Sequence, residues 1–181
     1  LSGAPSGSTL TASKTDCGVA LRVENPVLMA MVRHLEWRDH GPSIRNHVFQ
    51  IRPEYRRRGL GVRALMVQAR AAQQLGFAAI ELDATGNYQL AHARHAHDRY
   101  FGYCVWPQLG FDAHLSPELL RRLSAPWRAC QRVSELMASA EGRDEWHLHG
   151  DTLNNAKFDL APGSVSWRFL LAYSRQRNIR I

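Results

Sequence analysis

Residues 48–76 read VFQIRPEYRRRGLGVRALMVQARAAQQLG, and this stretch decides the fold of the chain. It opens with an apolar run that favours a β-strand and that ends before Pro53, which has no N–H group to donate to a sheet. A basic turn with two glycines follows at Arg56–Gly61. Apolar residues then recur at helical spacing, at Leu60, Ala64, Val67, Ala71 and Leu75. The predicted order is therefore strand, turn and long helix.

The predicted turn places bare backbone N–H groups at the start of the helix. These groups have no partner inside the helix and lie at the positive end of its dipole, so they attract phosphate. Gly59 and Gly61 let an anion approach the backbone without a Cβ in the way. Arg56, Arg57 and Arg58 add positive charge. The turn is predicted to bind a pyrophosphate; a basic turn with a glycine helix cap and no ligand is the plainer alternative.

The spacing of the turn differs from that of the GxxxxGK[ST] and GxGxxG phosphate loops. It reads Arg-x-x-Gly-x-Gly, at Arg56, Gly59 and Gly61, after a strand that ends in IRP, and a Gly110-Phe111 pair follows later. These features resemble the coenzyme A-binding motif of the GNAT acyltransferase superfamily, which is [QR]xxGx[GA] after a strand ending in VxP. The resemblance covers residues 44–111.

The resemblance implies an α/β fold with a mixed central sheet and flanking helices. Two parallel strands of that sheet splay apart around acetyl-CoA, the expected acyl donor, and its pantetheine arm pairs with the backbone of the first strand. The implied cofactor-binding residues are Phe49, Gln50, Ile51, Arg56, Arg57, Arg58, Gly59, Leu60, Gly61 and Val62.

The length of 181 residues suits one domain with a core of its own. Residues 1–16 are small and polar and are predicted to be a flexible leader. Residues 17–113 then form the acyltransferase-like core. Residues 114–181 form a C-terminal extension of the same domain, which exceeds the region of resemblance.

Strands are predicted at Val19–Glu24, Ile44–Ile51 and Phe77–Asp83. The last two flank the long helix, so they form a parallel crossover unit. Val27–Trp37 is predicted to be a helix, because its apolar residues recur at i, i+3, i+4 and i+7; a strand hairpin is the alternative.

The C-terminal extension is predicted to contain helices at Ser116–Leu123 and Pro126–Ala140. A polar turn follows at Glu141–Glu145, and Phe158–Ser166 has the turn residues of a loop. Trp167–Tyr173 is predicted to be a helix or a strand.

Acetyl transfer from a thioester to an amine requires a base to remove the amine proton. Glu81 and Asp83 are the predicted bases, because alternate residues of a strand share one face. His47 is a further candidate. Glu36 and Glu54 are weaker candidates, because each could simply be a surface carboxylate with no catalytic role. Backbone N–H groups near Gln50 and Ile51 are expected to hold the thioester oxygen.

The resemblance also implies a tyrosine four residues before Gly110 that protonates the departing thiolate, but Trp106 occupies that position. Tyr103 lies about one helical turn earlier and is the predicted acid, with Tyr100 as the alternative. A packed core is the favoured interpretation of the aromatic residues of this stretch, Phe101, Trp106 and Phe111. The alternative for Trp106 is a wall of the acyl pocket.

No metal site is predicted. Three histidines, His92, His95 and His97, lack metal-binding spacing and are expected in a solvated loop. The three cysteines are scattered and odd in number, which indicates buried thiols in a reducing compartment, rather than disulfides or zinc ligands, and a cytoplasmic location.

The formal net charge is +7, and no apolar run reaches the ~18 residues of a membrane span. The leading hypothesis is an acetyl-CoA-dependent N-acyltransferase that transfers an acetyl group directly to a primary amine of a small molecule, a protein or an aminoacyl-tRNA. The alternative is a non-catalytic GNAT-like module whose basic face binds RNA, a ribosome or an acidic protein. The sequence leaves the oligomeric state open.

Overall fold

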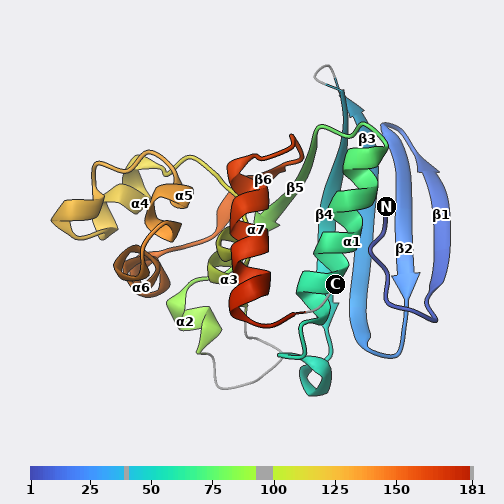
Figure 1. The fold of residues 1–181 in the computed structure, drawn as a ribbon, viewed down its shortest axis with the longest axis horizontal. Coiled ribbons are helices and arrows are strands. Elements are labelled where there is room, and N and C mark those ends of the chain that lie inside the picture. Colours follow the sequence, from blue (N-terminus) through green and yellow to red (C-terminus); the bar gives the residue numbers. More distant parts are fainter. Residues whose placement is uncertain (39–40, 93–99, 180–181) are drawn as a thin grey trace. The chain divides into compact units, whose positions relative to one another are not determined.

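A computed structural model describes residues 1–38, 41–92 and 100–179 of the chain, and Figure 1 shows its elements. Its sheet has six strands in the order β1-β2-β3-β4-β5-β6. Their bounds are Thr9–Thr15, Gly18–Glu24, Leu28–Arg38, Gly41–Ile51, Ala79–Ala84 and Leu153–Asp159. Strands β1 to β4 pair antiparallel, whereas β4 and β5 pair parallel. The mixed α/β sheet with flanking helices confirms the predicted fold class.

The chain divides into two compact units. The sheet unit comprises residues 1–82 and the C-terminal segment from Asp159, and the helical unit comprises residues 83–158. The chain leaves the sheet unit after Leu82 and returns to it at Asp159. The predicted organisation, a core at residues 17–113 with an extension of the same domain at 114–181, stays a prediction.

The strand, turn and helix predicted for residues 48–76 are confirmed. Strand β4 ends at Ile51, a short 3-10 turn spans Pro53–Tyr55, and helix α1 spans Leu60–Gln74. The buried face of α1 differs from the predicted one, since Val67 and Leu75 are exposed. The helix instead buries a stripe of mostly small and apolar residues, Val62, Ala64, Leu65, Met66, Gln68, Ala69 and Ala72.

The predicted helix at Val27–Trp37 is wrong, because Leu28–Arg38 forms strand β3. A β-bulge explains the misleading spacing: Leu28 pairs with Ile51 and Ala30 with Gln50, which leaves Met29 as an extra residue. Leu28 and Met31 therefore share one core face although they are three positions apart in the sequence. The strand hairpin was the correct alternative.

Part of the segment predicted as a flexible leader forms a strand. Thr9–Thr15 is strand β1, which pairs with β2 along its whole length, from Thr9 opposite Glu24 to Thr15 opposite Gly18. Its side chains are almost all exposed, so it lacks the alternation of apolar and polar residues that signals a half-buried strand.

Helix α7 spans Val165–Gln176 and packs against α1 within the sheet unit, as seen in Figure 1. The segment predicted as helix or strand at Trp167–Tyr173 is thus helical. Part of the loop predicted at Phe158–Ser166 belongs to α7 and part to β6. Among the described helices, none is long and apolar enough to cross a membrane.

The helical unit contains α2, α3, α4, α5 and α6, at Tyr88–Ala91, Gly102–Gln108, Pro117–Arg122, Val133–Met137 and Ala140–His149. The helix predicted to start at Ser116 is confirmed, with the Ser116 hydroxyl accepting a hydrogen bond from the Leu119 N–H at 3.3 Å. The long helix predicted at Pro126–Ala140 is wrong, because a 3-10 turn at Ala125–Trp127 and the short α5 replace it.

The polar turn predicted at Glu141–Glu145 is wrong as well, because these residues lie in α6. Ser139 caps this helix by accepting a hydrogen bond from the Gly142 N–H at 2.9 Å. Trp146 is fully buried and anchors α6, and its indole N–H donates to the Tyr103 carbonyl at 2.8 Å. One large buried side chain thus fixes a helix whose other residues are mostly polar.

Candidate functional site

Among the described residues, no side chain caps the N-terminus of α1 at the Arg56–Gly61 turn. Gly59 is the N-cap residue, with φ 75°. The first turn also carries no acidic residue. This left-handed backbone favours glycine, and the uncapped N–H groups at the positive end of the helix dipole suit an anion.

The three arginines of the turn have different positions. Arg56 is half-buried, and its Nε donates to the Ile51 carbonyl at 2.9 Å, which ties the turn to the end of β4. Arg58 is exposed and its guanidinium lies 5.5 Å from the Tyr55 ring centroid. Arg57 is exposed and has φ 60°. Arg57 and Arg58 are therefore the cations available to a ligand, whereas Arg56 braces the turn.

The end of β4 extends beyond its pairing with β5. The parallel register runs from Ser43 opposite Ala79 to Asn46 opposite Leu82, and β4 continues to Ile51. The segment Val48–Ile51 therefore has no β5 partner in the register. Backbone groups at such an edge can pair with an extended ligand, as a peptide does in strand addition.

At Phe49 and Ile51 a ligand could contact the backbone, because the side chains are engaged in packing. Both side chains pack against the core cluster that includes Leu28 and Met31. A Cβ placed on Gly61 would lie 3.7 Å from the Phe49 ring and from Ile51 Cδ1, so both side chains also face the first turn of α1. Val62 is buried, which leaves only its backbone for a ligand.

Ile179 lies beside the turn. A Cβ built on Gly59 would meet three atoms of the Ile179 side chain at 3.4 to 3.5 Å. Ile179 therefore packs against the start of α1.

A second group of polar side chains gathers on the sheet unit, at His34, Glu36 and His47, which we call the His–Glu–His cluster. One ligand atom from each of these residues lies within 4.8 Å of the others. The two imidazole centroids are 4.0 Å apart. The sequence pointed to Glu36 and His47 separately but missed His34, because the region was assigned to a helix. Alternation along a strand, His34-x-Glu36, was the signal available.

Glu81 and Asp83, the predicted bases, have different environments. Glu81 is buried on β5, where it pairs in register with Arg45 of β4. Asp83 is exposed and belongs to the helical unit, where its Oδ1 accepts a hydrogen bond from the Asn155 N–H at 2.8 Å. Asp83 thus supports the backbone at Asn155, which has φ 53°.

Tyr103, the predicted acid, is fully buried in the helical unit. Its hydroxyl donates to the His147 carbonyl at 2.8 Å, and burial strongly raises the pKa of this phenol. Trp106 packs its ring edge against Phe111 at a centroid distance of 5.3 Å, and Phe111 is buried. The arrangement supports the packed-core alternative for Trp106 and Phe111.

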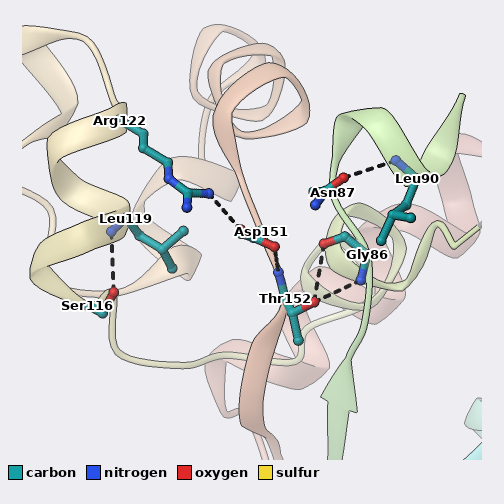
Figure 2. Close-up of polar contacts among 8 residues, drawn as sticks. All are labelled: Gly86, Asn87, Leu90, Ser116, Leu119, Arg122, Asp151 and Thr152. Atoms are coloured by element: carbon teal, nitrogen blue, oxygen red, sulfur yellow. Dashed lines mark hydrogen bonds and ion pairs between the residues drawn. The ribbon is translucent and has the colours of Figure 1, made fainter.

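A shallow hollow of about 240 Å³ lies on the helical unit. Figure 2 shows polar contacts near it: Arg122, which lines the hollow, forms an ion pair with Asp151 at 2.6 Å, and the Thr152 hydroxyl accepts a hydrogen bond from the Gly86 N–H at 3.0 Å. Burial opposes ionisation of Asp151, but hydrogen bonds from Arg122 and the Thr152 N–H outweigh it and lower its pKa. None of the residues predicted to bind the cofactor or to catalyse lines this hollow.

Of the three histidines in the predicted solvated loop, one lies within the described residues. His92 is exposed, and its Nδ1 lies 2.8 Å from the Tyr88 carbonyl. His95 and His97 lie outside the described residues. The hypothesis of a solvated histidine loop therefore stays a prediction.

A family model described as the acetyltransferase (GNAT) family matches residues 6–103. No curated protein matches the sequence. The matched region contains strands β1 to β5, the basic turn and helix α1. Because it covers more than half of the chain and includes the uncapped turn, the chain belongs to the acetyltransferase (GNAT) family.

Proposed function

We propose that the protein is an N-acetyltransferase that uses acetyl-CoA and transfers the acetyl group directly to a primary amine. The observation that carries the proposal is the uncapped N-terminus of α1 behind Gly59, next to the end of β4 that has no β5 partner. Family membership supports the general chemistry.

In this proposal the pyrophosphate of the coenzyme contacts the backbone N–H groups of Leu60, Gly61 and Val62. Arg57 and Arg58 supply positive charge from exposed positions. The pantetheine arm lies along the backbone of residues 48–51 and forms hydrogen bonds as an added strand would. The N–H groups near Gln50 and Ile51 hold the thioester oxygen as negative charge develops on it.

The transfer step joins the amine nitrogen to the carbonyl carbon of the thioester and breaks the bond between that carbon and sulfur. The amine proton passes to a base, directly or through water, and the thiolate takes up a proton. We assign Glu81 as the base, because it is a carboxylate held by a sheet strand of the matched region. We do not assign Asp83 or Tyr103 a role in the transfer step, because each forms a hydrogen bond within the helical unit, Asp83 with the Asn155 N–H and Tyr103 with the His147 carbonyl.

The test is calorimetric titration with acetyl-CoA, with free coenzyme A alongside. Gly59→Glu is expected to abolish binding, because it places a carboxylate where the phosphates bind. Gly163→Glu is the matched control: Gly163 has φ 74°, a Cβ there meets no atom within 4 Å, and it lies far along the chain from the turn. Equal binding by wild type and Gly59→Glu would reject the proposed cradle.

The acceptor is proposed only as a class. A small amine, a protein amine and an aminoacyl-tRNA each carry a primary amine, and a positive net charge of +7 favours the acidic carriers among them. Incubation with labelled acetyl-CoA and each acceptor separately identifies the class by which one gains label. We also propose a cytoplasmic location, which three free cysteines support.

A further inference from the structure

We propose that the His–Glu–His cluster is a binding site for a divalent transition-metal ion of the zinc and cobalt type. The site lies wholly within the sheet unit, and it goes beyond the proposed acetyl transfer and does not depend on it.

The backbone brings the three side chains together in two ways. His34 and Glu36 are alternate residues of β3, so they project from the same face of the sheet. His47 is the extra residue of a bulge in β4, because Val32 pairs with Val48 and Arg33 with Asn46. A bulge redirects the side chain of its extra residue, and here the His47 ring meets the His34 ring at 4.0 Å.

The donor atoms suit a borderline transition metal. Two imidazole nitrogens and one carboxylate oxygen are ligands that Zn²⁺, Co²⁺, Ni²⁺ and Fe²⁺ prefer, whereas Mg²⁺ and Ca²⁺ prefer oxygen ligands alone. Ligand atoms bound to one zinc ion at ~2.0–2.1 Å lie ~3–3.5 Å apart. The observed limit of 4.8 Å therefore needs only a small side-chain rotation to close around an ion. Three protein ligands leave an open coordination position.

Burial differs across the cluster in a way that suits an ion arriving from solvent. Glu36 is 7% exposed, His34 is half-buried and His47 is exposed. The shielded carboxylate strengthens its attraction to a cation, while the exposed imidazole leaves a path to the site. Two further charged groups occupy this sheet face: Arg45 lies opposite His34 in the strand register, and Glu81 lies opposite Arg45. An acidic residue therefore neighbours the one basic residue opposite the cluster.

Metal binding is measured on the full chain without acetyl-CoA, so its outcome is separate from that of the proposed activity. Calorimetric titration with Zn²⁺ is expected to show one equivalent. Titration with Co²⁺ is expected to produce the visible absorption bands of an ion with nitrogen ligands. His34→Gln and His47→Gln should each weaken binding about tenfold or more, since loss of even a supporting contact to a metal ligand costs that much.

Two controls separate this site from other donors. His149→Gln makes the same substitution at an exposed histidine of the helical unit and should leave binding unchanged. Cys17→Ser removes the exposed thiol, which is the other strong zinc ligand near the β1–β2 turn, and should also leave it unchanged. His47 is exposed, so His47→Gln decides the question even if a variant at the buried Glu36 fails to fold.

The proposal is overturned if Zn²⁺ and Co²⁺ do not bind at micromolar concentration, or if binding survives both histidine variants. Loss of binding in Cys17→Ser with retention in His47→Gln also overturns it. A loss of acetyl transfer in the histidine variants, with no metal bound by the wild type, would assign the cluster to acid–base chemistry instead.

Discussion

At the scale of single residues, Arg33 is a cation buried without a carboxylate partner among the described residues. It is 1% exposed, and its Nη1 donates to the side-chain oxygens of Asn46 and Gln68. Its Nε and Nη2 have no hydrogen-bond partner among the described residues. The guanidinium carbon lies 5.5 Å from the Phe49 ring centroid. Burial lowers the pKa of Arg33 to about 9.

The lowered pKa of Arg33 predicts that the contribution of this residue to stability becomes more favourable as pH rises above about 9. In that range the unfolded chain keeps the Arg33 proton and the folded chain releases it, so the Arg33 contribution to the free energy of unfolding increases with pH, by at most ~1.4 kcal/mol per pH unit. Below that range the charged form destabilises the fold by a constant amount.

Arg33→Met is the matched variant, because it keeps a long side chain and removes the charge. We expect it to raise the free energy of unfolding at neutral pH by on the order of 1 kcal/mol. In alkaline solution the variant should lack the increase in the free energy of unfolding with pH that Arg33 contributes in the wild type. Denaturant unfolding at several pH values measures both effects. Strong destabilisation of Arg33→Met at neutral pH would contradict the account.

Tyr103→Phe tests whether this phenol serves structure or catalysis. The variant loses the hydrogen bond to the His147 carbonyl and should lower the free energy of unfolding by ~1 kcal/mol. Acetyl transfer should stay within about twofold of wild type, since the fully buried hydroxyl has no exposed surface. Tyr100→Phe, at an exposed position, is the control for stability. A large loss of kcat with unchanged stability would restore Tyr103 as the acid.

At the scale of elements, the first turn of α1 contains two glycines with different roles. Gly59 has φ 75°, where a side chain is strained. Gly61 lies within the helix, and a Cβ there would make ordinary contacts at 3.7 Å. The conformation of the turn therefore favours glycine at Gly59. The backbone imposes no such preference at Gly61, where glycine is consistent with the proposed close approach of the coenzyme.

Alanine substitutions at these two glycines should change stability in opposite directions. Gly59→Ala should lower the free energy of unfolding by ~1–2 kcal/mol through backbone strain. Gly61→Ala should raise it by ~0.5–1 kcal/mol through helix propensity while weakening acetyl-CoA binding. Thermal unfolding and calorimetric titration of both variants measure the two effects. Unchanged acetyl-CoA affinity in Gly61→Ala would argue against approach of the coenzyme at this position.

At the scale of the whole molecule, the charge of +7 distinguishes the two function classes by salt dependence. RNA held through six to ten phosphates should lose ~10³–10⁵ in affinity between about 50 and 200 mM salt. Acetyl-CoA, with few phosphates and an extended contact along β4, should lose much less. Parallel binding measurements with acetyl-CoA and a structured RNA test this, and tight salt-sensitive RNA binding without acetyl-CoA binding would favour the non-catalytic module.

Local signals explain which elements the sequence predicts well. Pro53 follows the end of β4, two glycines lie in the turn, and apolar residues recur at helical spacing along α1. Neighbouring residues alone are therefore enough to predict this strand, turn and helix. The signal fails at β3, where the bulge at Met29 produces helical spacing in a strand. It also fails at α6, where mostly polar residues depend on the single buried anchor Trp146.

Signals between residues close together in the chain were sufficient to predict the α/β class, the family and the strand, basic turn and helix of residues 48–76. Only the tertiary structure brought His34 and Glu36 next to His47, buried Tyr103 and tied Asp83 to Asn155. The physical reason is that strand register, bulges and burial arise from contacts between residues distant in the chain, and the local backbone preferences of those residues do not encode them.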